Sequence, residues 1–395
     1  MKILIPNATG PTNIGDQAIF HGLLLFINKK YPEAEIIIQS SDPELYENTK
    51  YKIKPHLYFW SVFEKPQFLT RISRTIQLFI GFIGLKFNIN CGSLISDKLT
   101  DILNDYKKSD LIIFVGGGYL RSQKGFTQSL NVLMTLSLFC FGKIYKGKAI
   151  VAPMSFGPFA NKWQEKLSAY VLRDLKTVMV REDFSYAVLK KYKIKNLINS
   201  YDLALLLDKV SIQKTHDKPL LGFTIRPWRK PQEQRELENC FAEAIEKFYK
   251  LTYCRILPII QVKGIDDDLL TTESVIEILT KKGVSVLEPA IINDIEQAKQ
   301  IYSSLDLMLG MRMHSNIIAA TQGIPFVSIS YEYKTEGIAK YLGMSEYSIK
   351  QQEVNSEKLF KLLMGIYENK DSISIRIKNS IITIKTNLES SFNII

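Results

Sequence analysis

The stretch Leu305–Ser330, LDLMLGMRMHSNIIAATQGIPFVSIS, contains the pattern that decides the fold. The apolar run Leu305–Leu309 predicts a buried strand, and the apolar spacing of Ser315–Gln322 predicts a helix that a glycine ends. Phe326–Ser330 predicts the next strand of the same sheet. A strand, a helix and a second strand in this order are typical of a parallel α/β sheet with helices on its faces.

Two polar side chains, Arg312 and His314, lie in the loop between the first of these strands and the helix. In a parallel sheet, this loop opens onto the crevice at the carboxyl ends of the strands, where ligands bind. A guanidinium and an imidazole beside helix N-terminal amides suit a small anion. Arg312 and His314 are therefore the first candidate site residues.

The chain is long enough for two globular domains. Of its 395 residues, 46% are hydrophobic and 23% are charged, which is typical of a folded protein. The formal net charge of +11 suits an anionic partner such as a phosphorylated small molecule, an acidic membrane surface or a nucleic acid. A basic composition without a functional role is the alternative.

The compartment is predicted from apolar runs and cysteine spacing. The N-terminus MKILIPNATG has no signal-peptide pattern, and the apolar runs Ile76–Leu85 and Val132–Phe141 are shorter than the roughly 20 residues of a spanning helix. The cysteines show no paired spacing, which indicates free thiols and no zinc site: Cys91, Cys140, Cys240 and Cys254. We expect a cytoplasmic protein, and peripheral contact with the inner face of the plasma membrane stays open.

Repeated strand–helix alternation predicts two Rossmann-like, doubly wound α/β domains that face a cleft. Residues 1–207 are assigned to the first domain, with a basic and aromatic insertion at about 42–108. Residues 208–345 are assigned to the second domain, in which Val284–Leu287 predicts one of the strands. Residues 346–395 are expected to form a helical tail whose end is poorly ordered.

Two loops of the first domain follow predicted strands. The N-terminal loop leads to a helix near Asp16, which can cap the first turn or take part in catalysis, and the two roles are compatible. The strand Asp110–Val115 ends in Gly116, Gly117 and Gly118. Three glycines let backbone amides approach a ligand without a Cβ in the way.

The insertion at 42–108 mixes basic and aromatic residues. This composition fits an interfacial element that touches lipid headgroups, or a nucleic-acid face, although no nucleic-acid motif accompanies it. A helical insertion packed on the sheet is the third interpretation, which we favour for Ile76–Leu85. The residues concerned are Lys50, Lys52, Lys54, Lys65, Arg71, Arg74 and Lys86, with Phe59, Trp60, Phe63, Phe68, Phe79 and Phe82.

A set of motifs follows in a fixed order along the chain. They are Asn13-x-Gly15-Asp16-x-Ala18-Ile19, Gly116-Gly117-Gly118, Arg181-x-x-x-Ser185, Asp202, Arg312-x-His314, Gly323-x-Pro325 and Lys334-x-x-Gly337. This set resembles the polysaccharide pyruvyl transferase family, and the likeness runs from Lys2 to about Tyr341. The resemblance implies a glycosyltransferase-B-like fold.

The resemblance also implies an activity. Such enzymes transfer the pyruvate unit of phosphoenolpyruvate to two hydroxyls of a sugar in an envelope polysaccharide or its lipid-linked precursor, and they form a pyruvate ketal. Phosphoenolpyruvate would be the donor substrate, with no further cofactor and no metal. The first domain would be the acceptor side and the second domain the donor side.

Site residues follow from the matched motifs. His314 and Asp16 are the expected catalytic pair. Because phosphoenolpyruvate carries a phosphate and a carboxylate, its site needs well-placed cations. The expected donor-binding residues are Arg226, Arg312, Met313, His314 and Ser315. Acceptor or loop contacts are expected from Asn13, Gly15, Gly116, Gly117, Gly118, Arg181 and Lys334.

Three other functions stay open at this point. A nucleotide-sugar glycosyltransferase would need an acid for the ribose hydroxyls, and Glu332 could supply it. A non-catalytic saccharide-binding protein could use the same fold. Nucleic-acid binding by the basic insertion is the least favoured. Asp266–Asp268 is expected to be a solvated helix start rather than a cation site, and the acceptor sugar and oligomeric state are not predicted.

Overall fold

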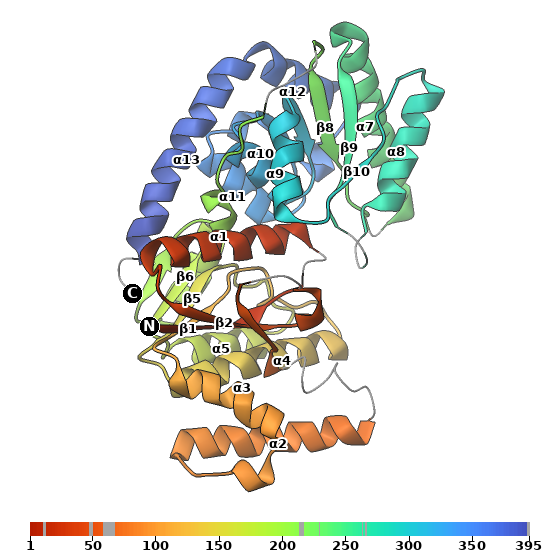
Figure 1. Cartoon of the computed structure of the whole chain (residues 1–395). Coiled ribbons are helices and arrows are strands. Elements are labelled where there is room, and N and C mark those ends of the chain that lie inside the picture. The colour runs from red at the N-terminus through yellow and green to blue at the C-terminus, as the bar shows by residue number, and fades with distance from the viewer. Residues whose placement is uncertain are drawn as a thin grey trace. The chain divides into compact units, whose positions relative to one another are not determined.

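The computed structural model describes residues 1–10, 13–46, 50–57, 68–212, 217–228, 230–262, 264 and 267–392. Residue contacts divide the chain into two compact units. Unit 1 comprises Met1–Pro11, Leu23–Leu203 and Ser390–Ile395, and unit 2 comprises Thr12–Gly22 and Ala204–Glu389. Each unit contains a parallel sheet with helices between its strands, which confirms the predicted α/β class (Figure 1).

The sheet of unit 1 has seven parallel strands in the order β3-β2-β1-β4-β5-β6-β7. Its inner strands are continuous apolar runs buried on both faces, as parallel sheets covered by helices require. The strands are β1 (Lys2–Ala8), β2 (Glu35–Ser40), β3 (Lys52–Pro55), β4 (Leu111–Phe114), β5 (Ala149–Met154), β6 (Thr177–Val180) and β7 (Leu197–Asn199).

Several α-helices precede Leu203 in the described part of the chain. They are α1 (Ile14–Lys30), α2 (Phe68–Phe87), α3 (Asp97–Lys108), α4 (Phe126–Ile144), α5 (Lys162–Leu172) and α6 (Asp183–Lys190). The first half of α1, as far as Gly22, clusters with unit 2 rather than with unit 1. This helix begins at Ile14, two residues before Asp16.

The sheet of unit 2 has six parallel strands in the order β10-β9-β8-β11-β12-β13. The strands are β8 (Leu220–Thr224), β9 (Arg255–Ile260), β10 (Ala290–Ile291), β11 (Leu307–Gly310), β12 (Phe326–Ser330) and β13 (Ser348–Lys350). The helices are α7 (Pro231–Thr252), α8 (Leu269–Lys281), α9 (Ile295–Ser304), α10 (Met313–Thr321), α11 (Tyr333–Tyr341), α12 (Ser356–Glu368) and α13 (Lys370–Phe392).

The prediction of a strand at Val284–Leu287 is wrong. Within this segment, Val286 makes an isolated parallel bridge with Ile256, and the edge strand β10 follows at Ala290–Ile291. The apolar run is too short to choose between a strand and an extended connection. Of the basic and aromatic insertion, Phe59, Trp60, Phe63 and Lys65 lie outside the described residues.

The poorly ordered end predicted for the tail is also wrong as far as Phe392. Helix α13 is continuous over 23 residues, and its isoleucines and leucine at three- and four-residue spacing are buried. They are Ile373, Ile377, Ile381, Ile384 and Leu388. Ser374 donates a hydrogen bond to the Gly323 carbonyl at 2.7 Å. The Ser/Lys composition concealed this stripe, which anchors the helix on unit 2.

Candidate functional site

The loop after β11 is fixed by a hydroxyl network at the carboxyl edge of the unit 2 sheet. The Oγ1 of Thr224, at the end of β8, lies 2.9 Å from Ser315 Oγ. Ser315 Oγ donates to the Arg312 carbonyl at 2.5 Å. Both hydroxyl-bearing residues are buried, so this network sets where α10 begins. The helix consequently starts at Met313, two residues earlier than predicted.

Asn316 holds the first turn of α10 against the neighbouring strands β11 and β12. Its side-chain amide donates to the Gly310 carbonyl at 3.2 Å and to Ser328 Oγ at 3.0 Å. A Cβ at Gly310 would overlap the Asn316 amide, so glycine is needed for this close approach. The loop that carries Arg312 and His314 is therefore attached to a rigid part of the sheet.

Arg312 is paired with a carboxylate that sequence reasoning placed elsewhere. Its Nε and Nη2 donate to Asp268 Oδ1 at 2.9 and 2.5 Å. Asp268 is fully buried, and its Oδ2 also accepts the backbone N–H of Val262 at 3.1 Å. Burial raises the pKa of the Asp268 carboxyl, and Arg312 acts in the opposite direction. The expectation that Asp266–Asp268 is a solvated helix start is wrong for Asp268, while Asp266 lies outside the described residues.

Arg226 follows β8 and lies on an aromatic ring. Its guanidinium carbon is 4.4 Å from the ring centroid of Tyr331, which follows β12. Trp228 meets the same tyrosine edge-on, with 6.5 Å between the ring centroids. Stacking on an aromatic face orients a guanidinium and leaves its charge in place. Arg226 is thus held at the same sheet edge as Arg312.

The N-terminal motif contacts the loop that carries His314. A Cβ added at Gly15 would lie 2.8 Å from His314 Cγ, so the Gly15 backbone lies directly against the imidazole. Asn13 makes an antiparallel bridge with Val262, accepts the Gly15 N–H at 2.9 Å and donates to Asp16 Oδ2 at 3.0 Å. The structure therefore brings Asn13, Gly15 and Asp16 to the carboxyl edge of the unit 2 sheet.

Three other predicted residues are buried in this region. Met313 and Ser315 lie in the first turn of α10, and Lys334 lies in the first turn of α11. The Lys334 Nζ is 3.7 Å from Glu332 Oε2. Lys334, Asn13 and Gly15 therefore lie in unit 2, as do Arg226, Arg312 and His314.

The glycines predicted to contact ligand lie at the carboxyl edge of the unit 1 sheet. Gly116 and Gly117 are buried, and Gly117 has a φ of +146° that favours glycine. The Gly117 carbonyl accepts the Ser155 N–H at 2.8 Å. Gly118 is partly exposed. The triplet thus forms a tight turn connected to the loop after β5.

Arg181 lies in the same edge of unit 1 but is almost completely buried. Its Nη1 donates to Asp202 Oδ2 at 2.5 Å, and its Nε donates to Ser155 Oγ at 2.9 Å. Glu182 Oε2 accepts from Ser155 Oγ at 3.0 Å and lies 3.7 Å from Arg181 Nε. These buried hydrogen bonds and ion pairs hold the loops after β5 and β6 in place.

Sequence reasoning missed Asp268 and Tyr331. Each orients one of the two predicted donor arginines, Arg312 and Arg226. Only an indirect signal for these partners is present in the sequence, since a cation at the end of a buried strand requires a partner of some kind. Nothing in the sequence indicates which of three consecutive aspartates supplies it.

Two features are absent from the described part of the chain, a cluster of metal ligands and a helix that could span a membrane. Its His, Cys, Asp and Glu side chains include no group of three that could hold a metal ion. None of its helices combines the length and the apolarity needed to cross a bilayer.

Two solved structures resemble the whole chain in fold. UDP-GlcNAc 2-epimerase from Neisseria meningitidis, bound to UDP-GlcNAc, has a TM-score of 0.57 and 12% identity, and the match covers 98% of this chain and 99% of that one. HepE from Anabaena, in complex with UDP-glucose, has a TM-score of 0.56 and 11% identity, with 100% and 97% coverage. This likeness concerns the fold alone, and it confirms the glycosyltransferase-B-like class.

Sequence comparison identifies the family. The amylovoran biosynthesis protein AmsJ from Erwinia amylovora is 23% identical over 416 residues, which cover 96% of this chain and 95% of AmsJ. Residues 13–333 match the family described as polysaccharide pyruvyl transferase. The matched span begins at Asn13 and includes Arg181, Arg226, Arg312 and His314. This chain belongs to the polysaccharide pyruvyl transferase family.

Proposed function

We propose that this protein transfers the pyruvate unit of phosphoenolpyruvate to two hydroxyls of a sugar and forms a pyruvate ketal. The acceptor would be an envelope polysaccharide or its lipid-linked precursor. Family membership and the relative AmsJ, whose name assigns it to amylovoran biosynthesis, support this proposal. The observation that carries it is the gathering of Arg226, Arg312 and His314 at the carboxyl ends of the neighbouring strands β8 and β11.

The two arginines suit the two anionic groups of the donor. A guanidinium binds a phosphate or a carboxylate through paired N–H donors of fixed geometry. Asp268 orients Arg312, and Tyr331 orients Arg226, so neither side chain has to be ordered when the donor binds. In this proposal Asp268 and Tyr331 are positioning residues.

The reaction adds two sugar oxygens to one carbon of the donor. A proton is added to the methylene carbon of phosphoenolpyruvate, and C2 becomes electrophilic. One hydroxyl attacks C2 and loses its proton, the C2–O bond to phosphate breaks, and the second hydroxyl attacks the same carbon. The two hydroxyls release two protons. One makes up for the proton that the new methyl group gained, and the other leaves on the phosphate.

These proton transfers need an acid and a base beside the donor. Histidine exchanges protons near neutral pH, so we assign the transfer to or from the donor to His314. Asp16 is the candidate that accepts a hydroxyl proton or orients the sugar. Its carboxylate is held by Asn13, and the adjacent Gly15 lies against the His314 ring. The N-terminal motif would thus align the two catalytic side chains.

Calorimetric titration tests the donor. Phosphoenolpyruvate is titrated into the wild-type chain, Arg312→Ala and the control Arg235→Ala, an exposed arginine on α7. UDP-glucose and UDP-GlcNAc are titrated in parallel. We expect saturable binding of phosphoenolpyruvate that Arg312→Ala abolishes and Arg235→Ala retains. Binding of a nucleotide sugar with no response to phosphoenolpyruvate would contradict the proposal and favour a glycosyltransferase.

A further inference from the structure

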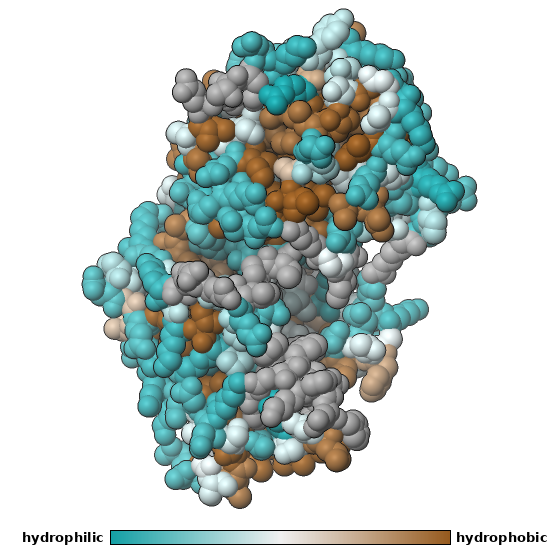
Figure 2. Space-filling view, turned by 45° about the vertical axis from the view of Figure 1, so that its right-hand side comes forward, coloured by the Kyte–Doolittle hydropathy of each residue, from teal (hydrophilic) through white to brown (hydrophobic). Residues whose placement is uncertain are grey.

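Helix α2 of unit 1 exposes a row of large apolar side chains to solvent. Leu69, Phe79 and Phe87 are 78%, 65% and 62% exposed, and Ile72 and Ile76 are also exposed. The spacing of three and four residues places these side chains within about 100° of one face of the helix. We call these five residues the α2 stripe. Apolar side chains gather at the lower edge of the molecule, where α2 lies (Figures 1 and 2).

The opposite face of α2 already supplies the helix's core contacts. Leu78, Phe82 and Leu85 pack against the buried core of unit 1, and Phe82 meets Phe141 edge-on with 5.6 Å between the ring centroids. A surface helix normally has one apolar face and one polar face. Because α2 is apolar on both, folding of unit 1 does not account for the α2 stripe.

Positive charge accompanies the stripe. Residues 65–96 contain Lys65, Arg71, Arg74 and Lys86 and no aspartate or glutamate, a net charge of +4. Lys86 is exposed beside the stripe, and Lys107 is exposed at the end of α3, which packs on α2. An apolar face flanked by cations matches an anionic bilayer surface, with hydrocarbon below and phosphate at the headgroup level.

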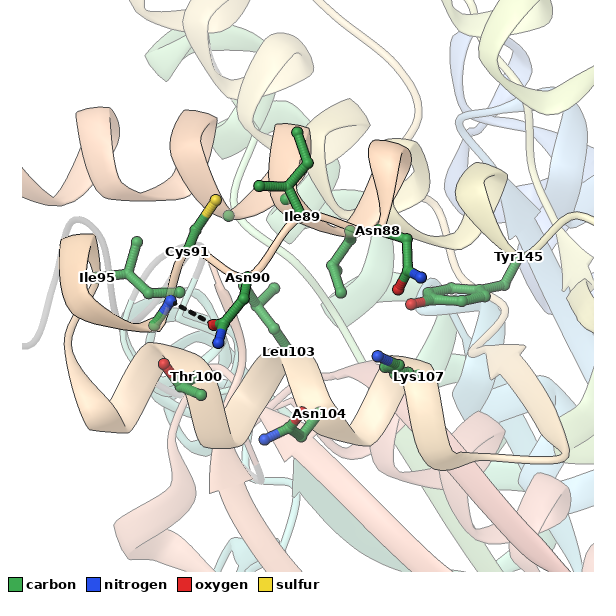
Figure 3. Close-up of a pocket in the computed structure, with 14 residues that line it drawn as sticks. Asn88, Ile89, Asn90, Cys91, Ile95, Thr100, Leu103, Asn104, Lys107 and Tyr145 are labelled. Atoms are coloured by element: carbon green, nitrogen blue, oxygen red, sulfur yellow. Dashed lines mark hydrogen bonds between the residues drawn. The ribbon is translucent and has the colours of Figure 1, made fainter.

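A cavity of about 350 Å³ opens between α2 and α3. Its lining includes the amides of Asn88 and Asn104, the Lys107 amine and the Tyr145 hydroxyl. Asn88, Lys107 and Tyr145 lie close together at one end of the cavity (Figure 3). Hydrogen-bond donors beside an amine suit a phosphate-bearing group on the side of α2 that faces α3.

We infer that α2 lies in the headgroup region of an anionic bilayer, with the α2 stripe in the acyl boundary and Lys86 and Lys107 on lipid phosphates. A second copy of the chain fits less well. A twofold dimer through this face would bring the exposed Lys86 and Lys107 of both copies together, and each copy would present a single convex helix. The inference does not depend on the proposed pyruvyl transfer.

Vesicle co-sedimentation tests the inference with the full chain. The vesicles are phosphatidylcholine alone, or phosphatidylcholine with one third phosphatidylglycerol. We expect binding to the anionic vesicles that raised salt weakens, and a loss of about tenfold or more in Ile76→Glu/Phe79→Glu. Leu270→Glu/Ile382→Glu, which changes two exposed apolar residues of unit 2, is the matched control and should bind as the wild type does.

A second variant separates charge from apolar contact. Lys86→Ala/Lys107→Ala retains the stripe, and each lysine should contribute about fivefold to the preference for anionic vesicles. Circular dichroism checks that all variants fold. Wild type that binds neither vesicle, or a stripe variant that folds and binds as the wild type does, would overturn the inference. Absence of vesicle binding together with a dimer that Ile76→Glu/Phe79→Glu dissociates would assign the stripe to a second copy instead.

Discussion

Arg181 and Arg312 both follow a parallel strand at its carboxyl end, one in unit 1 and the other in unit 2. Arg181 is enclosed by Asp202, Ser155 and the neighbouring Glu182. Arg312 is paired with the buried Asp268, and its side chain stays 12% exposed beside a histidine that is also partly exposed. The same fold position therefore holds a supporting arginine in one sheet and a candidate ligand-binding arginine in the other.

The comparison teaches how to separate the two roles. A strand-end cation that is buried among carboxylates and hydroxyls stabilises the loops around it, whereas a cation whose side chain stays partly exposed can still meet a ligand. In the sequence both arginines follow an apolar strand, and both are expected to contact a ligand. Their partners come from loops distant in the chain. Each prediction below tests this difference between the two edges.

Arg181→Ala should have the largest effect, and it should act on stability. It leaves Asp202 as a buried, uncompensated carboxylate, which lowers the free energy of unfolding by about 3–5 kcal/mol. Urea unfolding followed by circular dichroism measures the change. The matched control is Arg173→Ala, whose exposed arginine lies 3.6 Å from Asp174 in the same unit and should cost less than about 1 kcal/mol. Equal stability of the two variants would mean that Arg181 is not a supporting residue.

His56 gives the unit 1 edge a pH dependence. It follows β3 and is buried, and burial lowers its pKa to about 4. Because the unfolded chain binds a proton to this residue near pH 6.5 and the folded chain does not, stability is complete above pH 6.5 and falls as the pH approaches 4. The full loss is about 3 kcal/mol.

The His56 effect is measured by urea unfolding at a series of pH values between 4 and 7. His56→Phe should flatten the decline, because it removes a histidine whose pKa is lower in the folded chain than in the unfolded chain. His21→Phe removes a histidine of unit 2 whose pKa burial also lowers, so it measures the contribution of that unit. A decline of the same slope in His56→Phe and wild type would assign the pH dependence to other groups.

Asp268→Asn should weaken donor binding in unit 2. The amide cannot hold the Arg312 guanidinium as a carboxylate does, and hydrogen bonds to charged groups are worth about 1.5–3 kcal/mol. We expect phosphoenolpyruvate affinity to fall by tenfold or more in calorimetry. Asp267→Asn, one residue earlier and half-buried, should retain it. Unchanged affinity in a folded Asp268→Asn would show that the ion pair does not position Arg312 for the donor.

Gly15→Ala should have the smallest of these effects, and it should act on turnover. The new methyl group overlaps the His314 imidazole and displaces it. With an identified acceptor sugar, we expect the rate of phosphate release from phosphoenolpyruvate to fall about tenfold. Gly147→Ala, where a Cβ meets open space, is the control. Equal turnover in the two variants would show that the N-terminal motif does not position His314, the proposed catalytic histidine.

The sequence predicts the alternating strands and helices well, because continuous apolar runs and a helix-ending glycine are local signals. It also places Arg226, Arg312 and His314 at one sheet edge, since parallel strands end on the same side. It does not predict the partners Asp268 and Tyr331, which depend on loops from other strands. The prediction of a poorly ordered tail is wrong for α13, because serine and lysine residues stand between the isoleucines that follow helical spacing.

The N-terminal motif shows the same limit. Asn13, Gly15 and Asp16 are early in the chain, so sequence order assigns them to the first domain. Their contacts with Val262 and His314 place them in unit 2. Chain order is a poor guide to unit membership when a helix such as α1 has its ends in different units.

Histidine ring resonances test the central claim most directly, since the chain has only four histidines. Phosphoenolpyruvate is titrated into chain labelled at its histidine rings, and His314→Gln and His56→Phe assign the two resonances of interest. If the donor binds at the unit 2 edge, the His314 resonance shifts with saturation and the His56 resonance in unit 1 does not. Saturable shifts of His56 with His314 unmoved would place the donor in unit 1 and contradict the account.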